Sequence, residues 1–418
     1  MSSLLKWART LGRLTPLAPL RFPTAGFKVV PKSEILEEEQ FQDAISAGQY
    51  YPVNIGDIYA EKYQILGKLG FGTTSTVWLA RNLQLGEHHY VALKVYTRNM
   101  GHRDEFQIYD YIRRVGNQSH PGYPHIRTAW DIFTIPSPRV PAGSDETTEH
   151  YCLVQKPMWA TWKALIRRNP AGRFNVALLK AGLQQVLLAL DFLHTQCHLV
   201  HTDIKSDNIL QEIADGRILA WFADLEMAGP SPRKLVDGYT IYRSRPFELP
   251  EFFGDAVLGN LGSAVRGDEK RNHDAQPDVY RSPETMLNID WSYPVDIWNL
   301  GCMIWDLFEG RHLFYGQDPD GKGYSTRAHL AEVIALLGPP PLDLVKRGVR
   351  SDEFFTEEGQ WRSEVVVPKP TTLEENEFFL EGEDKEMFIS LVRGMLQWRP
   401  EDRKTAKELL QDPWLNSP

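Results

Sequence analysis

The sequence predicts an α+β fold in which strands dominate the first part of the chain and helices the rest. Apolar residues alternate on both sides of a glycine-rich turn within residues 63–80, the pattern of two strands joined by a tight turn. Apolar residues at helical spacing follow at about 103–114, and further apolar helices are predicted at 296–308 and 327–337. Hydrophobic residues make up 42% of the 418 residues, which is enough for a packed core.

The glycine-rich turn has the composition of a phosphate-binding loop. Gly70 and Gly72 carry no side chain, so the backbone amides beside them can approach phosphate groups closely. Ser75 stands where a third glycine is usual, and an ordinary hairpin is the alternative interpretation when the motif is taken alone. The candidate phosphate-binding residues of this segment are Leu69, Gly70, Phe71, Gly72, Thr73, Thr74, Ser75 and Val77.

A lysine ends the next predicted strand, at residues 91–94, and lies 22 residues after Gly72. At this distance from the turn, Lys94 is predicted to contact the same phosphates, although a surface lysine is the alternative. The helix that follows supplies Glu105 as its predicted ion-pair partner. Asp104 is the second choice, and either acid could instead stabilise the start of the helix through the helix dipole.

Residues 201–210, His-Thr-Asp-Ile-Lys-Ser-Asp-Asn-Ile-Leu, are the most informative segment of the chain. An acid, a lysine two residues later and an asparagine five residues later form an arrangement typical of phosphoryl transfer. Asp203 is predicted to accept the proton of a substrate hydroxyl, and Lys205 to neutralise the moving phosphoryl group. Asn208 is predicted to hold a magnesium ion, so the segment is a candidate catalytic loop.

Three residues further along are predicted to support this loop. Glu284, in Ser-Pro-Glu, is expected to form a buried two-pronged ion pair with Arg403, because a guanidinium group matches a carboxylate in shape. Asp296 opens an apolar helix and is expected to brace the backbone of the candidate catalytic loop. A simple helix-start carboxylate is the alternative interpretation of Asp296.

Taken together, residues 63 to about 415 resemble eukaryotic protein kinases, and in particular the SR-protein kinase (SRPK) family. Within that family the chain is similar to the divergent SRPK-like kinases of filamentous fungi. The segments that carry the closer resemblance are Tyr51–Asp57, Ser75–Trp78, His-Thr-Asp at 201–203, and Val295–Cys302.

The resemblance implies a bilobal protein-kinase fold, with a small β-rich N-lobe at 63–156 and a larger, mainly helical C-lobe at 157–415. It implies Mg²⁺ and ATP as cofactor and cosubstrate. The turn residues named above, with Lys94 and Glu105, would then bind ATP. The expected partner is a protein substrate, since the family transfers phosphate to serine in Arg/Ser-rich proteins.

The resemblance implies a second magnesium ligand, the aspartate of an Asp-Phe-Gly or Asp-Leu-Gly motif, and the chain has two candidates for this position. Asp224 lies sixteen residues after Asn208, but Glu226 stands where this motif needs the backbone freedom of glycine. Asn260 lies fifty-two residues after Asn208, follows an apolar strand, precedes a glycine, and stands 24 residues before Glu284. We favour Asn260, because its context matches the motif better than a bare tripeptide does. Residues 211–255 then form an insert within the C-lobe that is rich in proline and charge and is expected to be mostly loop.

An asparagine at this position removes a negative charge from the metal site. Magnesium is held mainly by carboxylates and phosphates, so Asn260 should weaken metal binding and charge neutralisation. Asp255 or Asp224 could compensate. Two functions therefore stay open: a serine/threonine protein kinase, of normal or weakened activity, and a pseudokinase that serves as a scaffold or binding module.

Composition narrows the classes of partner. The net charge of −9 argues against direct nucleic-acid binding and suits a basic protein partner. No apolar run of eighteen residues is present, so we expect no membrane span. We also expect the chain to be a monomer. Cys152, Cys197 and Cys302 are far apart in apolar segments, which predicts reduced core residues.

The N-terminal segment differs in composition from the rest. Residues 1–33 contain basic residues and no acid, and residues 4–14 permit a short amphipathic helix. This composition resembles a mitochondrial transit peptide, whereas a disordered leader on a cytoplasmic or nuclear kinase is the preferred interpretation. Residues 34–62 are expected to be an extension that packs on the kinase.

The residue before Asp203 gives a testable prediction. Most kinases carry an arginine there that binds an activation-loop phosphate, and this chain has Thr202. We therefore expect activity that does not depend on phosphorylation between Asn260 and Glu284. Treatment with a protein phosphatase should leave the rate unchanged, and a loss of activity that rephosphorylation restores would contradict the prediction.

Overall fold

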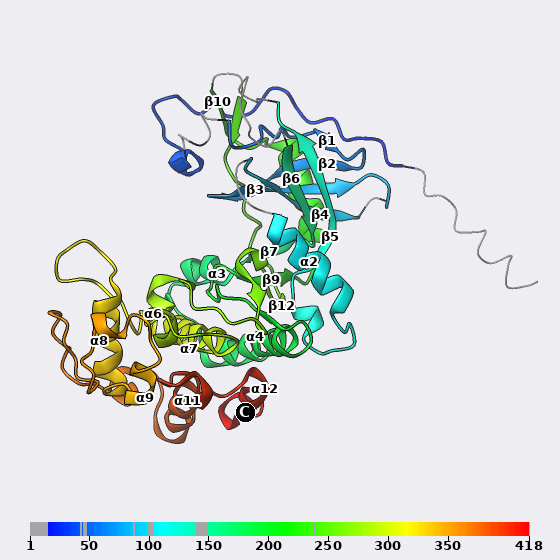
Figure 1. The fold of residues 1–418 in the computed structure, drawn as a ribbon. Helices are drawn as coiled ribbons and strands as arrows, with labels where there is room; N and C mark the ends of the chain where they lie inside the picture. Colours follow the sequence, from blue (N-terminus) through cyan, green and yellow to red (C-terminus); the bar gives the residue numbers. More distant parts are fainter. Residues whose placement is uncertain are drawn as a thin grey trace, which may run out of the picture. The chain divides into compact units, whose positions relative to one another are not determined.

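The computed structural model describes residues 16–41, 44, 48–86, 88–98, 103–138, 149–236 and 239–417. These residues belong to two compact units. The first comprises Met1–Phe106, Thr128–Trp159 and Ile213–Gly254, and the second comprises Gln107–Arg127, Ala160–Glu212 and Asp255–Pro418. Strands predominate in the first unit and helices in the second (Figure 1), as the sequence predicts. The amphipathic helix permitted at residues 4–14 lies outside the described residues.

The first unit is built on an antiparallel sheet of six strands in the order β1-β2-β3-β4-β6-β5. Its strands are β1 (Ile58–Tyr59), β2 (Tyr63–Gly72), β3 (Ser75–Asn82), β4 (Tyr90–Tyr96), β5 (Ala129–Pro136) and β6 (Glu149–Gln155). Alternate side chains such as Ile65, Trp78 and Leu93 form the core on one face. Tyr51 and Ile55 of the extension pack against this core, which places the segment before β2 on the sheet.

The insert is folded, which corrects the expectation that residues 211–255 are mostly loop. It contains helix α5 (Arg217–Ala228) and an antiparallel hairpin of β10 (Arg233–Val236) and β11 (Tyr239–Tyr242). Phe222 of α5 packs where Gly67 of β2 leaves room, since a Cβ on Gly67 would lie 2.7 Å from the phenyl ring. This contact is distant in sequence, so local composition did not reveal the helix.

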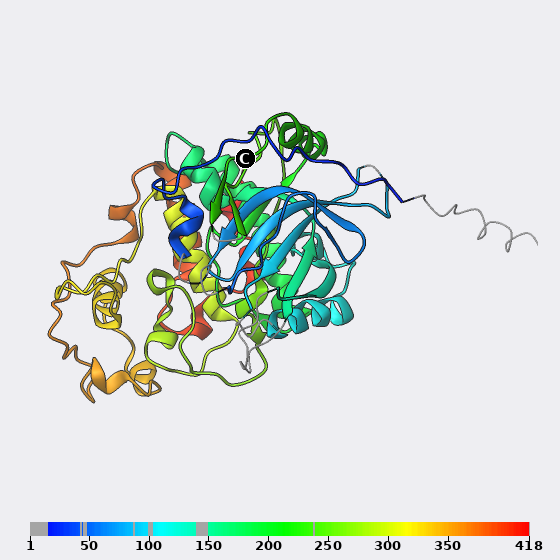
Figure 2. The same ribbon diagram turned by 90° about the horizontal axis from the view of Figure 1, so that it is seen from above.

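The insert also belongs to a different part of the fold from the one expected. Residues 213–254 are part of the first unit, although the prediction placed them within the C-lobe. The N-terminal segment lies beside the hairpin (Figures 1 and 2), where Val29 forms a parallel bridge with Arg233. The buried carboxylate of Glu226 accepts hydrogen bonds from the N–H and hydroxyl of Ser231 (2.7 Å each) and from Arg245 (2.9 Å). The insert is therefore held by buried polar contacts as well as by apolar packing.

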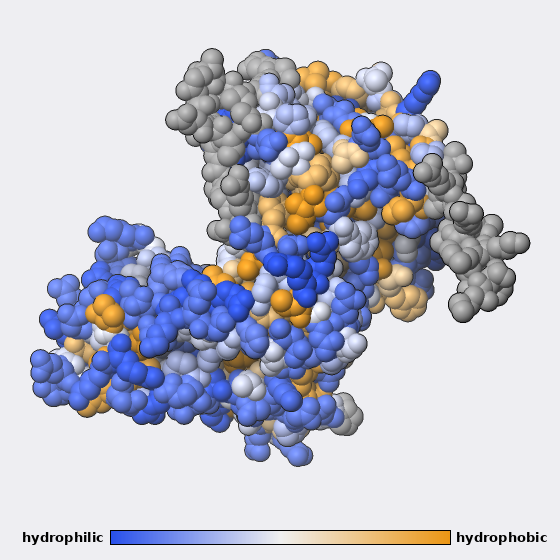
Figure 3. Space-filling view, turned by 45° about the vertical axis from the view of Figure 1, so that its right-hand side comes forward, coloured by the Kyte–Doolittle hydropathy of each residue, from blue (hydrophilic) through white to orange (hydrophobic). Residues whose placement is uncertain are grey.

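The second unit is mainly helical. Its α-helices are α3 (Trp162–Arg168), α4 (Val176–Thr195), α6 (Pro283–Met286), α7 (Pro294–Glu309), α8 (Thr326–Leu337), α9 (Leu342–Val345), α10 (Leu373–Asn376), α11 (Gly382–Met395), α12 (Ala406–Leu409) and α13 (Pro413–Asn416). The helices predicted at 296–308 and 327–337 are confirmed as α7 and α8. The visible face of this unit is mainly hydrophilic, whereas more apolar side chains show on the first unit (Figure 3).

The remaining elements are short, or have residues in both units. Helix α2 (Arg103–Val115) contributes residues to both units, as does a three-stranded sheet in the order β12-β9-β7. The strands of this sheet and of the other small sheet in the second unit are β7 (Met158–Thr161), β9 (Ile209–Ile213), β12 (Phe253–Leu258), β8 (Leu199–Val200) and β13 (Val265–Arg266). The 3₁₀ helices are η2 (Glu37–Phe41), η3 (Tyr123–His125), η4 (Leu261–Ser263), η5 (Asp278–Tyr280), η6 (Ser351–Glu353) and η7 (Pro400–Asp402).

Two predictions from composition can be compared with the structure. All three cysteines are buried and unpaired with one another, as expected for reduced core residues. Among the described residues, helix α4 is long and apolar enough to cross a membrane, but half of the window that meets this test is buried inside the protein. A packed core helix passes the same test, so α4 is weak evidence for a span.

Glu309 at the end of α7 makes stability depend on pH. Burial raises the pKa of its carboxyl to about 7, and the nearby Glu377 carboxylate adds to this effect. A folded pKa above the unfolded value stabilises the fold at low pH, and this contribution is lost as the pH rises through about 7. Glu309→Gln should therefore raise the free energy of unfolding by about 2 kcal/mol at pH 8 and by clearly less at pH 5, which is closer to the unfolded pKa of about 4.3.

Thermal unfolding at both pH values measures this difference. The exposed Glu357→Gln serves as the control and should leave the unfolding midpoint unchanged at either pH. An equal effect of Glu309→Gln at pH 5 and pH 8 would show that Glu309 does not titrate as described.

Candidate active site

A strained residue opens the candidate catalytic loop, which runs from His201, after β8, to Asn208, before β9. Thr202 has φ of +67°, a left-handed conformation that a β-branched residue disfavours. The fully buried carboxylate of Asp296 accepts hydrogen bonds from the N–H groups of His201 (2.7 Å) and Thr202 (2.8 Å), and contacts His194 Nε2 at 2.9 Å. The Thr202 hydroxyl donates to the carbonyl of Ser263 (2.9 Å). These contacts hold the loop in its strained form, so Asp296 braces the backbone as predicted.

The three predicted catalytic side chains of the loop lie together. Lys205 Nζ donates to Asp203 Oδ1 at 2.9 Å. Asn208 Nδ2 donates to Asp203 Oδ2 and to its backbone carbonyl, both at 2.7 Å. Both carboxylate oxygens of Asp203 are therefore held in place, while the side chain keeps 17% of its surface exposed. A fixed, accessible carboxylate with a cation beside it can accept a proton from a bound hydroxyl group.

Asn260 lies beside Asn208, which favours it over Asp224 as the residue at the second metal position. Asn260 Nδ2 donates to Asn208 Oδ1 at 3.0 Å. Its backbone is left-handed, with φ of 61°, a conformation that asparagine tolerates better than most residues. The buried ring of His201 fixes this segment, because Nε2–H donates to the carbonyl of Gly259 (3.0 Å) while Nδ1 accepts from the N–H of Asp203 (3.2 Å).

The two acids considered as substitutes have other surroundings. Asp224 is on the exposed side of α5 in the first unit, and Asn208 is in the second. Asp255, at β12, accepts a hydrogen bond from Gln185 of α4 at 2.7 Å. No group of three or more His, Cys, Asp or Glu side chains arranged to hold a metal occurs in the part of the chain that the structure describes. The sequence favoured Asn260 on motif context, and its contact with Asn208 supports that choice.

The glycine-rich turn is a tight hairpin of the first unit. Leu69, Gly70, Phe71 and Gly72 end β2, Thr73 and Thr74 form the turn, and Ser75 and Val77 lie in β3. A Cβ added to Gly70 or Gly72 would meet no atom within 4 Å, so the space beside both residues is open to a ligand. The ring of Phe71 contacts Phe41 (centroids 6.3 Å apart) and lines a cavity, while its predicted part in ATP binding stays a prediction.

Lys94 has its predicted partner. In β4 it pairs in register with Val77 of β3, and its Nζ lies 3.6 Å from Oε1 of Glu105 on α2. Glu105 is buried, and Lys94 Nζ also lies 4.4 Å from the centre of the Tyr96 ring. The side chain of the alternative partner, Asp104, is outside the described residues. The pair can hold the ammonium group in position for an anionic ligand.

Tyr50 contacts the glycine-rich turn, although sequence reasoning did not single it out. Its hydroxyl oxygen lies 2.8 Å from the backbone carbonyl oxygen of Gly72 and 2.9 Å from that of Thr73, so its one proton is shared between the two. The extension before β2 is thereby joined to the tip of the hairpin. The only sequence signal was an aromatic residue next to the Tyr51–Asp57 segment, and nothing in its spacing pointed to the turn.

The predicted long-range ion pair between Glu284 and Arg403 is present. Arg403 Nη1 and Nη2 donate to the two carboxylate oxygens at 2.6 and 2.7 Å, and both side chains are fully buried. Arg403 also donates to the carbonyl of Pro294 at 3.1 Å and lies over the ring of Trp298. A buried pair with this geometry ties α6 to the residues before α12.

A cavity of about 710 Å³ in the second unit is lined by Lys205, and sequence reasoning did not find it. It also contains the carboxylates of Asp207 and Asp306. Lys163 pairs with Asp207 at 3.0 Å, and His312 bonds to Asp306. Burial raises the pKa of Asp306, and the hydrogen bond to Asp306 raises the pKa of His312. Each carboxylate of this cavity therefore already has a basic partner within the chain.

Comparison with known proteins identifies the family of this arrangement. The family described as "Protein kinase domain" matches residues 63–230 and 258–415. A serine/threonine protein kinase of Aspergillus fumigatus is 40% identical over 96% of both chains. The serine/threonine-protein kinase SRPK of Physarum polycephalum is 28% identical over 90% of this chain and 91% of its own.

A solved structure of a kinase domain has the same fold, with a TM-score of 0.66 and 21% identity over 88% of this chain and 99% of that one. The family match leaves out residues 231–257, which include the β10–β11 hairpin. The unmatched segment is shorter than the insert predicted at 211–255.

The role of Asp296 can be tested by removing its carboxylate. Asp296→Ala would leave the N–H groups of His201 and Thr202 buried without an acceptor, so we expect a loss of about 3 kcal/mol in the free energy of unfolding. Thermal or urea unfolding measures the loss. Asp343→Ala, which removes an exposed helix-start carboxylate on α9, should cost less than about 1 kcal/mol. Equal losses in the two variants would rule out a special role for Asp296.

Proposed function

The chain belongs to the protein kinase family, and we propose that it transfers the γ-phosphate of ATP to serine in Arg/Ser-rich proteins. Family membership and the names of its relatives make it a serine/threonine protein kinase, for which ATP is the cosubstrate. The observation that carries the proposal is the complete Asp203–Lys205–Asn208 arrangement on a braced loop.

Each side chain has a role that follows from its contacts. Asp203 would accept the proton of the substrate serine, because its carboxylate is ionisable, fixed and accessible. Lys205, bonded to that carboxylate, would offset the negative charge of the phosphoryl group in transfer. Lys94, held by Glu105, would orient the phosphates of ATP, and the open space beside Gly70 and Gly72 would admit them.

The residues present fit magnesium in ligand type. The ion takes oxygen ligands, and the amide oxygens of Asn208 and Asn260 are of that kind. When bound, the metal would neutralise charge on the phosphates. Asn260 brings no charge of its own, so we propose that magnesium binds more weakly here than it would beside an aspartate. The chain should therefore need a higher magnesium concentration for activity.

Two observations support an Arg/Ser-rich substrate. The chain has a net charge of −9, and carboxylates recognise arginine well, because a guanidinium group can bind both oxygens. A relative that covers nine-tenths of the chain is named SRPK, which agrees with this substrate class.

A scaffold without catalytic activity is the second candidate function. The observation that favours it is the hydrogen bond from Asn260 to Oδ1 of Asn208, the oxygen that would hold a metal ion. A pseudokinase of this kind would bind protein partners, and ATP binding alone would not separate it from an active kinase.

Phosphate transfer from Mg-ATP to an Arg-Ser repeat peptide separates the two candidates. We expect transfer by the native chain, a loss of about 100-fold or more in Asp203→Ala, and an increase in Asn260→Asp. A Lys-Ser repeat peptide of equal charge should be a poorer substrate, because lysine lacks the guanidinium fork. No transfer by the native chain together with recovery in Asn260→Asp would overturn the proposed activity and favour the scaffold.

A further inference from the structure

A cavity of about 650 Å³ lies within the first unit, on the back of the glycine-rich hairpin. Lys68 and Phe71 of β2 and Trp78 of β3 line it. Neighbouring residues of a strand point to opposite faces, so Val77, with its partner Lys94, belongs to the other face of the sheet. The cavity is therefore distinct from the side of the hairpin that carries Lys94.

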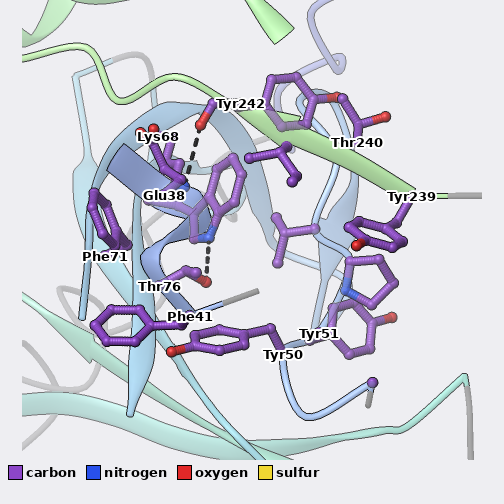
Figure 4. Close-up of a pocket in the computed structure, with 15 residues that line it drawn as sticks. Glu38, Phe41, Tyr50, Tyr51, Lys68, Phe71, Thr76, Tyr239, Thr240 and Tyr242 are labelled. Atoms are coloured by element: carbon purple, nitrogen blue, oxygen red, sulfur yellow. Dashed lines mark hydrogen bonds and ion pairs between the residues drawn. The ribbon is translucent and has the colours of Figure 1, made fainter. Parts of the chain in front are cut away.

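The other walls come from the extension and the insert, which are far apart in sequence. The close-up in Figure 4 shows Phe41, Tyr50 and Tyr51 of the extension on one side of the space and Tyr239, Thr240 and Tyr242 of β11 on another. Lys234 of β10 bonds to both carboxylate oxygens of Glu39 (2.8 and 3.0 Å), and both side chains are nearly buried. Buried ionic contacts thus hold the two segments around the cavity.

Seven of the fifteen residues that line the cavity are aromatic, which decides the kind of ligand that would fit. Phe41 stacks on Tyr50 with the ring planes 19° apart, and Trp78 packs edge-on against Tyr242. Rings with exposed faces or edges favour a flat aromatic partner. Small-molecule sites are largely apolar with a few placed polar groups, and the lining of this cavity has that character.

Lys68 supplies the polar group. Its Nζ donates to the carbonyl of Tyr242 at 3.2 Å and forms an ion pair with Glu38, whose Oε1 lies at 3.8 Å, beyond hydrogen-bond distance. That oxygen of Glu38 already accepts from the N–H (2.7 Å) and hydroxyl (2.9 Å) of Ser244. Burial lowers the pKa of Lys68 to about 8, as expected for an amine in an apolar cavity. An amine with one hydrogen bond within reach can donate another to a ligand.

Occupancy of the cavity would affect the glycine-rich turn. Tyr50, which lines the cavity, holds the carbonyls of Gly72 and Thr73 through its hydroxyl group. Phe71, two residues before Thr73, contacts the ring of Phe41. A ligand packed against these rings would restrict the movement of Tyr50 and hence of the turn.

We propose that this cavity binds a planar aromatic small molecule that carries a hydrogen-bond acceptor for Lys68, and that its occupancy changes ATP binding through Tyr50. The binding itself goes beyond the proposed function, because it needs neither a phosphate acceptor nor catalysis. Only the coupling to ATP depends on nucleotide binding by the glycine-rich turn.

Fluorescence titration of the full chain with 8-anilinonaphthalene-1-sulfonate tests the site, since this probe joins aromatic rings to an acceptor group. We expect saturable binding that weakens at least tenfold in Thr240→Phe, which fills the cavity, and at least threefold in Lys68→Met. Thr134→Phe makes the same change at an exposed position on β5 and should bind as the native chain does. Circular dichroism checks that each variant is folded.

Unchanged binding in both Thr240→Phe and Lys68→Met would place the probe elsewhere and overturn the proposal. If Thr240→Phe does not fold, Lys68→Met decides between the two results. The coupling is tested by ATP affinity with and without saturating probe: a shift is expected in the native chain and a smaller one in Tyr50→Phe. Equal shifts in both would remove Tyr50 from the account. Probe binding without phosphate transfer would overturn only the proposed activity.

Discussion

The carboxylate of Asp296 is the contact on which the candidate catalytic loop depends. It accepts the N–H groups of two successive residues at the point where Thr202 adopts a conformation that its branched side chain disfavours. With the backbone turned in this way, His201 bonds to both Gly259 and Asp203. Asp203 bonds in turn to Asn208, and Asn208 to Asn260, so the buried acid braces the loop that carries the candidate catalytic residues.

The first unit is stabilised in a different way, by contacts between two segments that lie outside the six-stranded sheet. The extension before β2 and the insert at 213–254 both pack on strands β2 and β3, and Lys234 binds Glu39 between them. Phe222 of the insert packs over Gly67 of β2, and Tyr50 of the extension bonds to the turn at the end of the same strand. The glycine-rich hairpin is therefore supported from behind by parts of the chain that a minimal sheet would not need.

Residues whose chemistry requires a distant partner were the easiest to predict from the sequence. Glu284 needed a guanidinium group, Lys94 needed an acid, and both partners were found where expected. The insert was harder, because its proline and charge content describes only its loops, whereas α5 is stabilised by packing on β2. The orientation of Phe71 and the contact of Tyr50 with the turn depend on which face of the hairpin the extension covers. No local pattern of residues carries that information.

The central claim is that Asn260, and not Asp224, is the residue beside Asn208 at the metal position. The most direct test is the magnesium dependence of ATP binding, measured by calorimetry in the native chain, Asn260→Asp and Asp224→Asn. The account predicts that Asn260→Asp lowers the magnesium concentration needed for half-maximal binding, because a carboxylate restores a charge at the site. It predicts no change in Asp224→Asn, since that side chain lies on the exposed side of α5. A loss of magnesium dependence in Asp224→Asn, with none of the expected gain in Asn260→Asp, would contradict it.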